Sequence, residues 1–449
     1  MRLATPRGGG NVAKCQKSRR AGARGRRKLA LVLLLVGCGG AERRWRRPSR
    51  SAAPGPDGNS QGSLQRLLLL CFAGAVGGGL DIDADLTVGI AEGLDLVPFD
   101  DNEVLIQFGS RSFPSELLRD PDLTGLMRKV VTHLGNGPLK VGDLLARLPE
   151  VQVNGAREMI IGLLDRGILT DIRRSPVEQY LRYAFTGEPS VSDRRVTIVG
   201  AGPLGARVSH SLALHGVGRL TLVDDRQVDD VWKAFAPPAM SGVGSEGLAH
   251  VVVAECLASC GYRFVEALDA GLDVDGLEFA VAQADLVVVA LERADVRLGH
   301  LLNRICLRAR TPWLVTTVDG NLGLVGPLFS PPDSACYNCY RALADAASPQ
   351  SEMAARYRRH ALRRGAAGFA PGLPAYVEIL SGYTSMAAVR FLVEGSSFAL
   401  ARVLVFNFEQ MVLETEDVLK LPRCPVCGMG KASYRSPFAP EVVADGRGM

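Results

Sequence analysis

The chain has 449 residues, of which 47% are hydrophobic, so it is long enough for two or three domains with apolar cores. Residues 1–50 hold 15 Lys or Arg against a single acid, Glu42, and so carry +14, whereas the whole chain carries +5 and its remainder therefore −9. A basic surface is the usual footprint of a nucleic-acid binder. The acidic remainder argues against a nucleic acid as partner.

Residues 1–93 are rich in Arg, Gly, Pro and Ser and lack sustained periodicity, which predicts a disordered, basic extension. Two apolar stretches interrupt it, Lys28–Gly40 and Leu67–Gly79, and neither reaches the roughly 18 to 20 residues that span a bilayer. The first ends at Cys38 in the manner of a bacterial lipoprotein signal, which would export the protein. We favour a start codon assigned too far upstream, because paired cysteines downstream suit a reducing compartment. The expected location is therefore cytoplasmic, without a stable membrane span.

Residues 94–182 are predicted to form a small winged-helix domain. The stretches "LDLVPF" and "EVLIQFG" predict short strands around a polar turn, and "ILTDIRR" a later one. Between them, "DLTGLMRKVVTHLG", "VGDLLARL" and "NGAREMIIGLLDRG" have the periodicity of helices. Winged helices often bind DNA. Here the third helix sets only Arg157 and Arg166 against two acids, so a peptide or protein is the expected partner.

Residues 191–436 alternate apolar strands with helical segments. The strands are expected at "RVTIVG", "RLTLVDD", "RFVEAL", "ADLVVVAL" and "PWLVTTVDG". Continuous apolar strands separated by helices are typical of a parallel sheet covered on both faces. The predicted fold class is therefore α/β, with a Rossmann-like domain after the winged helix and a disordered tail at residues 437–449.

A glycine pattern marks the first strand-to-helix turn of this domain. Gly200, Gly202 and Gly205 form G-x-G-x-x-G, and Asp224 ends the next strand. Such glycines allow a tight turn and close approach of a phosphate to a helix N-terminus, while the acid binds a ribose hydroxyl. The motif predicts the fold, and it leaves open whether a nucleotide is bound, because the turn persists as a scaffold in proteins that have lost their ligand.

Two Cys-x-x-Cys pairs, Cys336 with Cys339 and Cys424 with Cys427, lie 84 residues apart. Four thiolates in two such knuckles suit a closed, structural Zn²⁺ site. Redox chemistry would place one pair at a helix start, which we do not expect here, and two disulfides remain possible in an exported protein. The remaining cysteines of the α/β region, Cys256, Cys260 and Cys306, are expected to be buried by apolar packing.

The order of "IVGAGPLG", "GVGRLTLVDD", "VDGNLGLVGPLFSPPDSACYNCY" and "PRCPVCG" resembles the ThiF/MoeB superfamily of ubiquitin-activating-enzyme-like adenylating proteins. The resemblance covers about residues 194–431. It implies an ATP-binding α/β fold, a structural zinc and usually a homodimer or pseudo-dimer.

The sequence departs from the pattern that adenylating members of this superfamily need. The stretch "RQVDDVWKAFAPPAM" lacks the Asn and Arg that clamp ATP phosphates, "SGVGSEGLAH" lacks the expected Lys, and in "ALERADVR" only Asp295 remains of an Asp–Asn pair for magnesium. Without cations over the phosphates, the charge that develops in adenylation has no stabiliser. No cysteine lies between Tyr340 and Arg423, where a thioester-forming nucleophile is expected. We therefore expect a vestigial nucleotide site, no bound ATP and no catalytic residue.

A winged helix before a degenerate ThiF-like domain resembles the leader-peptide-binding partner of YcaO cyclodehydratases, which act in the biosynthesis of thiazole/oxazole-modified peptides, including bacteriocins. The resemblance implies that a precursor leader peptide adds as a strand to the small sheet and lies against the third helix. The groove is expected between Val104–Phe113 and Asn154–Gly167. The candidate peptide-binding residues, from the strand, its following turn and the helix, are Val104, Ile106, Phe108, Arg111, Arg157, Ile161 and Arg166.

The expected function is a non-catalytic accessory subunit that presents a ribosomally made precursor to a YcaO-type enzyme. One alternative is a ThiF-like enzyme that adenylates the C-terminus of a carrier protein. A nucleotide-dependent oxidoreductase would leave the zinc knuckles and winged helix unexplained. A zinc-bearing DNA regulator disagrees with the acidic body of the chain.

Overall fold

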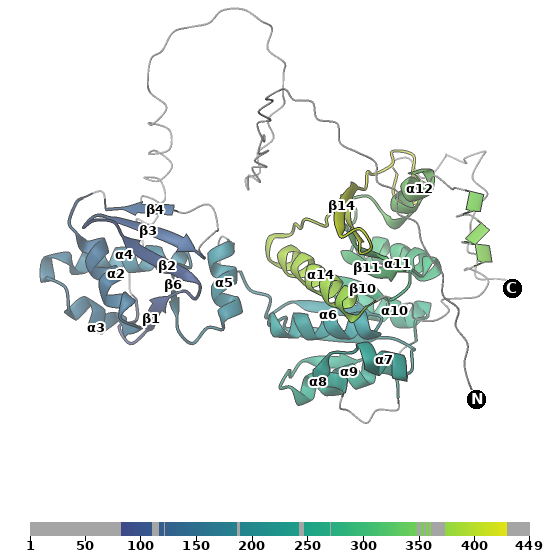
Figure 1. The fold of residues 1–449 in the computed structure, drawn as a ribbon, viewed down its shortest axis with the longest axis horizontal. Coiled ribbons are helices and arrows are strands. Elements are labelled where there is room, and N and C mark those ends of the chain that lie inside the picture. Colours follow the sequence, from purple (N-terminus) through teal and green to yellow (C-terminus); the bar gives the residue numbers. More distant parts are fainter. Residues whose placement is uncertain are drawn as a thin grey trace, which may run out of the picture. The chain divides into compact units, whose positions relative to one another are not determined.

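The computed structural model describes residues 82–109, 116–120, 122–185, 189–241, 247–269, 271–347, 352–353, 356–357, 359–360 and 373–428. Arg111, most of the predicted basic extension and the predicted C-terminal tail lie outside these residues. The described residues form a small N-terminal domain and a larger α/β domain (Figure 1).

The N-terminal domain contains the strands and three helices expected from the sequence, with additional short elements. They are β1 (Thr87–Ile90), β2 (Leu94–Pro98), β3 (Glu103–Phe108), β4 (Glu116–Arg119), α2 (Leu126–Gly135), β5 (Leu139–Lys140), α3 (Val141–Ala146), η1 (Glu150–Gln152), α4 (Val153–Asp165), β6 (Leu169–Asp171) and α5 (Pro176–Ala184).

Two three-stranded antiparallel sheets frame this domain, in the orders β5-β1-β6 and β2-β3-β4. Fully buried Val88, Val130, Leu144 and Ile160 bring β1 and the three helices into one apolar core. Strand β1 lies inside residues 1–93, so the predicted boundary of the disordered extension at residue 93 is wrong. The folded part begins earlier because the short run "TVGI" pairs with β5 and β6.

The α/β domain contains each strand that the sequence predicts. Its elements are β7 (Arg195–Val199), α6 (Pro203–Leu214), β8 (Arg219–Val223), α7 (Asp230–Phe235), α8 (Pro238–Ser241), α9 (Ala249–Ser259), β9 (Val265–Ala267), α10 (Val274–Ala282), β10 (Leu286–Leu291), α11 (Val296–Ala309), β11 (Trp313–Asp319), β12 (Leu322–Phe329), α12 (Tyr337–Ala347), α14 (Pro374–Glu394), β13 (Arg402–Asn407) and β14 (Val412–Asp417).

These strands form one eight-stranded sheet in the order β14-β13-β12-β11-β10-β7-β8-β9. From β9 to β11 the neighbours are parallel, as predicted. Strands β12, β13 and β14, which were not predicted, extend the sheet in antiparallel fashion.

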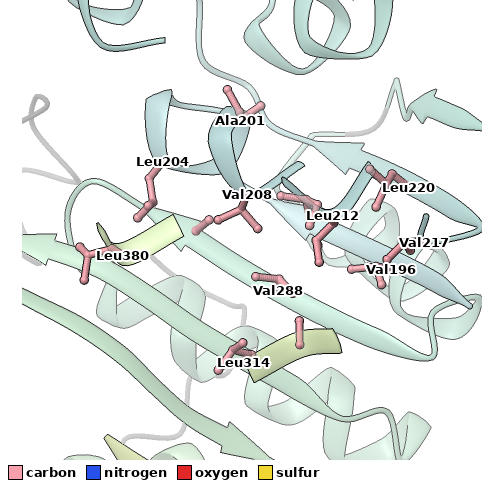
Figure 2. Packing of buried hydrophobic residues seen from close by; sticks show 14 of the residues in the cluster. Val196, Ala201, Leu204, Val208, Leu212, Val217, Leu220, Val288, Leu314 and Leu380 are labelled. Carbon is pink, nitrogen blue, oxygen red and sulfur yellow. The ribbon is translucent and has the colours of Figure 1, made fainter. Parts of the chain in front are cut away.

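Helices cover both faces of the parallel part, because side chains alternate along each strand. In β10, Val288 points into a cluster with residues of α6, α9 and α14, whereas Val287 points into a cluster with α10 and α11. Figure 2 shows the first cluster, where Leu204, Val208 and Leu212 of α6 lie over the strand residues. This packing fixes the start of α6 against the carboxyl ends of β7 and β10.

Candidate functional site

A pocket of the α/β domain lies at the carboxyl ends of β7, β8 and β10. In open α/β sheets ligands bind at this edge, where strand order reverses. The pocket has a volume of about 670 Å³. Its charged lining residues are five acids and three arginines, namely Asp224, Asp225, Asp229, Glu292, Asp295, Arg226, Arg293 and Arg297.

The predicted glycines form the turn between β7 and α6. Gly200 has φ +98°, a left-handed conformation that favours glycine, and a Cβ there would lie 2.3 Å from the carbonyl oxygen of Ala290. A Cβ on Gly205 would lie 1.8 Å from the carbonyl oxygen of Gly200. Glycine is therefore required at both positions, because any side chain would collide with the backbone of this close turn.

Asp224 lies beside this turn, but its carboxylate is already used by the protein. It accepts hydrogen bonds from the backbone N–H of Ala201 (2.5 Å) and of Arg226 (3.1 Å). Burial raises the pKa of Asp224, although these hydrogen bonds oppose the shift. This aspartate therefore stabilises the glycine-rich turn through its two backbone hydrogen bonds.

Glu292, which the sequence analysis did not select, contacts the turn directly from the end of β10. Its carboxylate accepts a hydrogen bond from the Leu204 backbone N–H at 2.8 Å and pairs with the Arg226 guanidinium at 3.2 Å. The side chain is 7% exposed. Burial raises its pKa, opposed by the hydrogen bond from Leu204 and the charge of Arg226. Its position directly after a buried strand of a parallel sheet was the available signal.

A second unpredicted residue, Trp232 of α7, contacts the same turn. Its fully buried indole donates a hydrogen bond from Nε1 to the carbonyl oxygen of Ala201 at 2.9 Å. Trp232 lies in the stretch where the resemblance led us to look for phosphate-clamping Asn and Arg. In this chain, the segment expected to hold the phosphate-clamping residues instead packs the indole of Trp232 against the glycine-rich turn.

Three arginines that were not among the predicted site residues line the pocket. Arg226 is paired with Glu292 and with Asp229, and Arg293 donates to the hydroxyl of Tyr357 at 2.7 Å. Asp295, the expected remnant of a magnesium pair, caps α11 by accepting two backbone N–H groups. Arg226 and Asp295, two of the charged residues that line the pocket, are therefore already bound by the protein, one in ion pairs and the other in a helix cap.

The four cysteines of the two knuckles come together, as predicted. Their sulfur atoms all lie within 4.8 Å of one another, with Cys336–Cys339, Cys336–Cys424 and Cys339–Cys427 separations of 3.8, 3.7 and 3.5 Å. Tetrahedral zinc with Zn–S bonds of about 2.3 Å requires sulfurs about 3.8 Å apart. The hydrogen bond with Cys336 lowers the pKa of Cys424 to about 4. The donor set is thus consistent with a structural zinc.

Two details of the cysteine predictions are wrong. Cys336 directly precedes α12 and Cys339 lies in its first turn, so one pair does occupy a helix start. The proximity of the second pair still favours a metal over redox chemistry. Cys256 and Cys306 are buried as expected, whereas Cys260 is exposed at the end of α9.

The candidate peptide groove in the N-terminal domain differs from the prediction. Strand β3 is central, paired with β2 on one side and β4 on the other, so its backbone cannot accept another strand. Val104 and Ile106 are buried in the core, and the ring of Phe108 stacks on that of Tyr183. Among the described strands, the outer edges of this sheet are β2 and β4.

The helix residues of the predicted groove remain accessible in part. Arg157 and Ile161 are half-buried on α4, one helical turn apart. Arg166, at the end of α4, forms an ion pair with Glu116 of β4. This pair places the C-terminal end of α4 beside β4, while Arg111 lies outside the described residues.

None of the helices in the described ranges is both long and apolar enough to cross a membrane.

Comparisons with known proteins place the α/β domain. The ThiF family model matches residues 249–426. The chain is 29% identical over 257 residues to the SAMP-activating enzyme E1 of Haloferax volcanii, covering 54% of this chain and 84% of that protein. It is 24% identical to the molybdopterin-synthase adenylyltransferase of Salmonella typhimurium, covering 55% of this chain and 92% of that protein.

Solved structures agree on the fold. E. coli MccB, crystallised with MccA-N7isoASN, has a TM-score of 0.54 at 16% identity, covering 76% of this chain and all of that one. MccB has also been crystallised with ATP. By sequence match and fold together, the α/β domain of this chain is ThiF-like and similar to E1-like adenylating enzymes.

Proposed function

We propose that this protein is an accessory subunit that binds the leader of a ribosomally made precursor peptide. It presents the peptide to a separate YcaO-type ATP-dependent cyclodehydratase, which forms thiazoline or oxazoline rings, and does not itself adenylate. The observation that carries this proposal is the outer edge of β4 beside α4, which pairs with no other strand in the part of the chain that the structure describes.

The fold alone does not decide between a nucleotide and a peptide, because MccB has been crystallised both with ATP and with MccA. The choice between a nucleotide and a peptide as ligand therefore depends on the side chains at the two sites of this chain. At the glycine turn, the Leu204 N–H and the Arg226 guanidinium already bind Glu292, and acids outnumber arginines in the pocket lining. An ATP triphosphate would meet net negative charge there, which disfavours adenylation by this chain.

The N-terminal domain offers the features that strand addition needs. β4 pairs with β3 along Glu116–Arg119 and has no neighbour on its other side among the described strands. Main-chain hydrogen bonds along such an edge supply affinity, and side-chain pockets supply register. Ile161 supplies half-buried apolar surface on α4, and Arg157 supplies positive charge one turn away. This combination favours an extended peptide with an apolar anchor and acidic residues.

The four-cysteine site supports the fold in this proposal. A closed site of four thiolates leaves no open position for substrate, so a zinc ion held by it would be structural. Because Cys336 and Cys339 adjoin α12 whereas Cys424 and Cys427 follow β14, the metal would join the C-terminal segment to the sheet.

Peptide binding is tested by fluorescence polarisation with the labelled precursor encoded beside the gene. We expect Arg157→Glu and Ile161→Asp each to weaken binding at least about tenfold, because they act at the apolar and charged contacts. Arg147→Glu makes the same charge change at the exposed C-cap of α3 and should leave the Kd unchanged.

Strand addition is tested with a precursor whose leader carries N-methyl groups at alternate residues. Two such peptides are compared, one methylated at the odd and one at the even leader residues. Because successive backbone N–H groups of a strand point to opposite edges, each peptide loses the hydrogen bonds along one edge only. One of the two should lose binding while the other retains it. Equal binding of both would show that the peptide does not add to a strand edge.

One alternative function retains specific support, namely adenylation of a carrier-protein C-terminus. The curated relatives are adenylating enzymes, and three arginines line the pocket. This alternative predicts ATP–pyrophosphate exchange that is lost in Asp224→Asn. Exchange by the wild type would support it and contradict the accessory role.

A further inference from the structure

The carboxylate of Glu292 lies against the backbone of the glycine-rich turn. A Cβ built on Gly202 would be 2.3 Å from both carboxylate oxygens and 2.5 Å from their carbon. No side chain larger than hydrogen fits at Gly202 while Glu292 keeps this position. The carboxylate is therefore held flat against the second glycine of the motif.

The second glycine is the position at which a dinucleotide pyrophosphate approaches the backbone in this type of turn. The first helical N–H groups and the positive end of the helix dipole stabilise the anion there. In this chain the first residue of α6 is Pro203, which has no N–H, and the next N–H, that of Leu204, donates to Glu292. Arg226 completes the set of donors on the carboxylate.

We propose that Glu292 serves as an internal anion in the phosphate-binding position of the glycine-rich turn, and thereby excludes nucleotide phosphates from it. Each element of a phosphate site is present: the glycine that permits close approach, a helix N–H and a guanidinium. The ligand is supplied by the chain itself, from the end of β10. This inference stands independently of peptide binding in the N-terminal domain.

The packing around the turn favours this assignment over an accidental contact. The Glu292 side chain is 7% exposed, so its carboxylate has exchanged water for the Leu204 N–H and Arg226. Trp232 donates to the Ala201 carbonyl in the same turn, which restricts a shift of the backbone away from Glu292. Removal of the carboxylate would leave the buried Leu204 N–H without its acceptor and would take one of its carboxylate partners from Arg226, and a small anion could replace the lost acceptor.

The test is rescue of thermal stability by an external anion. Glu292→Ala removes the carboxylate and opens the space beside Gly202, and inorganic phosphate and pyrophosphate are titrated against chloride of matched ionic strength. We expect the unfolding temperature of Glu292→Ala to rise by about 3 to 6 °C when phosphate reaches about ten times its Kd. The wild type should not respond, because its own carboxylate occupies the position.

Two further variants serve as controls. Glu292→Gln keeps the side-chain volume and an acceptor oxygen for Leu204, so it should show no phosphate-specific rise. Glu278→Ala removes an exposed carboxylate that pairs with Arg308 at 3.2 Å, and it should also show none. A phosphate-specific rise in either variant would show that the anion binds elsewhere.

Equal stabilisation of the wild type and Glu292→Ala by phosphate would overturn the proposal, as would a folded Glu292→Ala that does not respond. If Glu292→Ala is too unstable to purify, its refolding yield in phosphate against chloride gives the same comparison. A higher yield in phosphate supports the proposal, and equal yields contradict it.

Discussion

Replacing Cys424 by serine should release a zinc ion and destabilise the C-terminal end of the α/β domain. Cys424 lies 3.7 Å from Cys336 by sulfur–sulfur distance, close to the 3.8 Å or so of tetrahedral zinc. Serine keeps the size of the side chain but loses the thiolate that binds the metal. Three ligands would remain, an incomplete set for a structural site.

The magnitude follows from how little else holds this segment. The apolar cluster around the cysteines is small, and its buried members include three of the ligands themselves. Structural zinc contributes on the order of 10 kcal/mol in small domains, and loss of a metal is among the few single changes that cost more than about 4 kcal/mol. With about 2 to 4 °C per kcal/mol for a domain of this size, the unfolding temperature should fall by roughly 8 to 16 °C.

The assay combines metal analysis by mass spectrometry with thermal unfolding followed by circular dichroism. We expect about one equivalent of zinc in the wild type and almost none in Cys424→Ser. Cys260→Ser changes an exposed cysteine outside the cluster and should keep both the zinc and the unfolding temperature. Unchanged zinc content in Cys424→Ser, or a wild type without zinc whose stability ignores chelators, would refute the four-thiolate site.

Three further outcomes are expected in unfolding experiments. Trp232→Phe should lower the free energy of unfolding by about 1 to 3 kcal/mol more than Trp313→Phe does, because, of the two indole N–H groups, only that of Trp232 has a hydrogen-bond partner among the described residues. Chemical denaturation should show that Gly205→Ala loses at least about 3 kcal/mol through its clash with the turn carbonyl, while Gly382→Ala, open on α14, gains about 0.5 to 1 kcal/mol. Burial raises the pKa of Glu292, so the folded state binds its proton more tightly than the unfolded chain, and wild-type stability falls as pH rises above the unfolded value of 4.5. Glu292→Gln lacks this loss, so its unfolding temperature should gain on that of the wild type as the pH rises above this value, and a difference that stays constant with pH would contradict the raised pKa.

Local sequence patterns predicted the parts of the molecule that local chemistry determines. In the G-x-G-x-x-G turn, glycine is required at Gly200 and Gly205 because a Cβ at either position would collide with a backbone carbonyl oxygen. Each Cys-x-x-Cys pair places two metal ligands on one knuckle. Apolar runs predicted the parallel strands, and both faces of β7, β8, β10 and β11 carry buried side chains. These elements needed no knowledge of distant partners.

The antiparallel extension was missed although it had a local signal. Gly320 and Asn321 form the turn that joins β11 to β12, and Gly320 has φ +62°. A Gly-Asn pair between two apolar runs is a signal for a two-residue hairpin.

The site residues that were missed depend on contacts between distant segments. Glu292 reaches Leu204 across 88 positions, and Trp232 reaches Ala201 across 31. The choice of β3 as the peptide strand failed because β2 and β4 pair with it on either side, which leaves β3 no free edge. Only the folded sheet contains this information.

The most direct test of the central claim is a titration of the purified full-length protein with its labelled precursor peptide and with Mg·ATP. The account predicts peptide binding in the micromolar range, no detectable ATP binding and no pyrophosphate exchange. Tight ATP binding with pyrophosphate exchange that Asp224→Asn abolishes would contradict it and identify an adenylating enzyme instead.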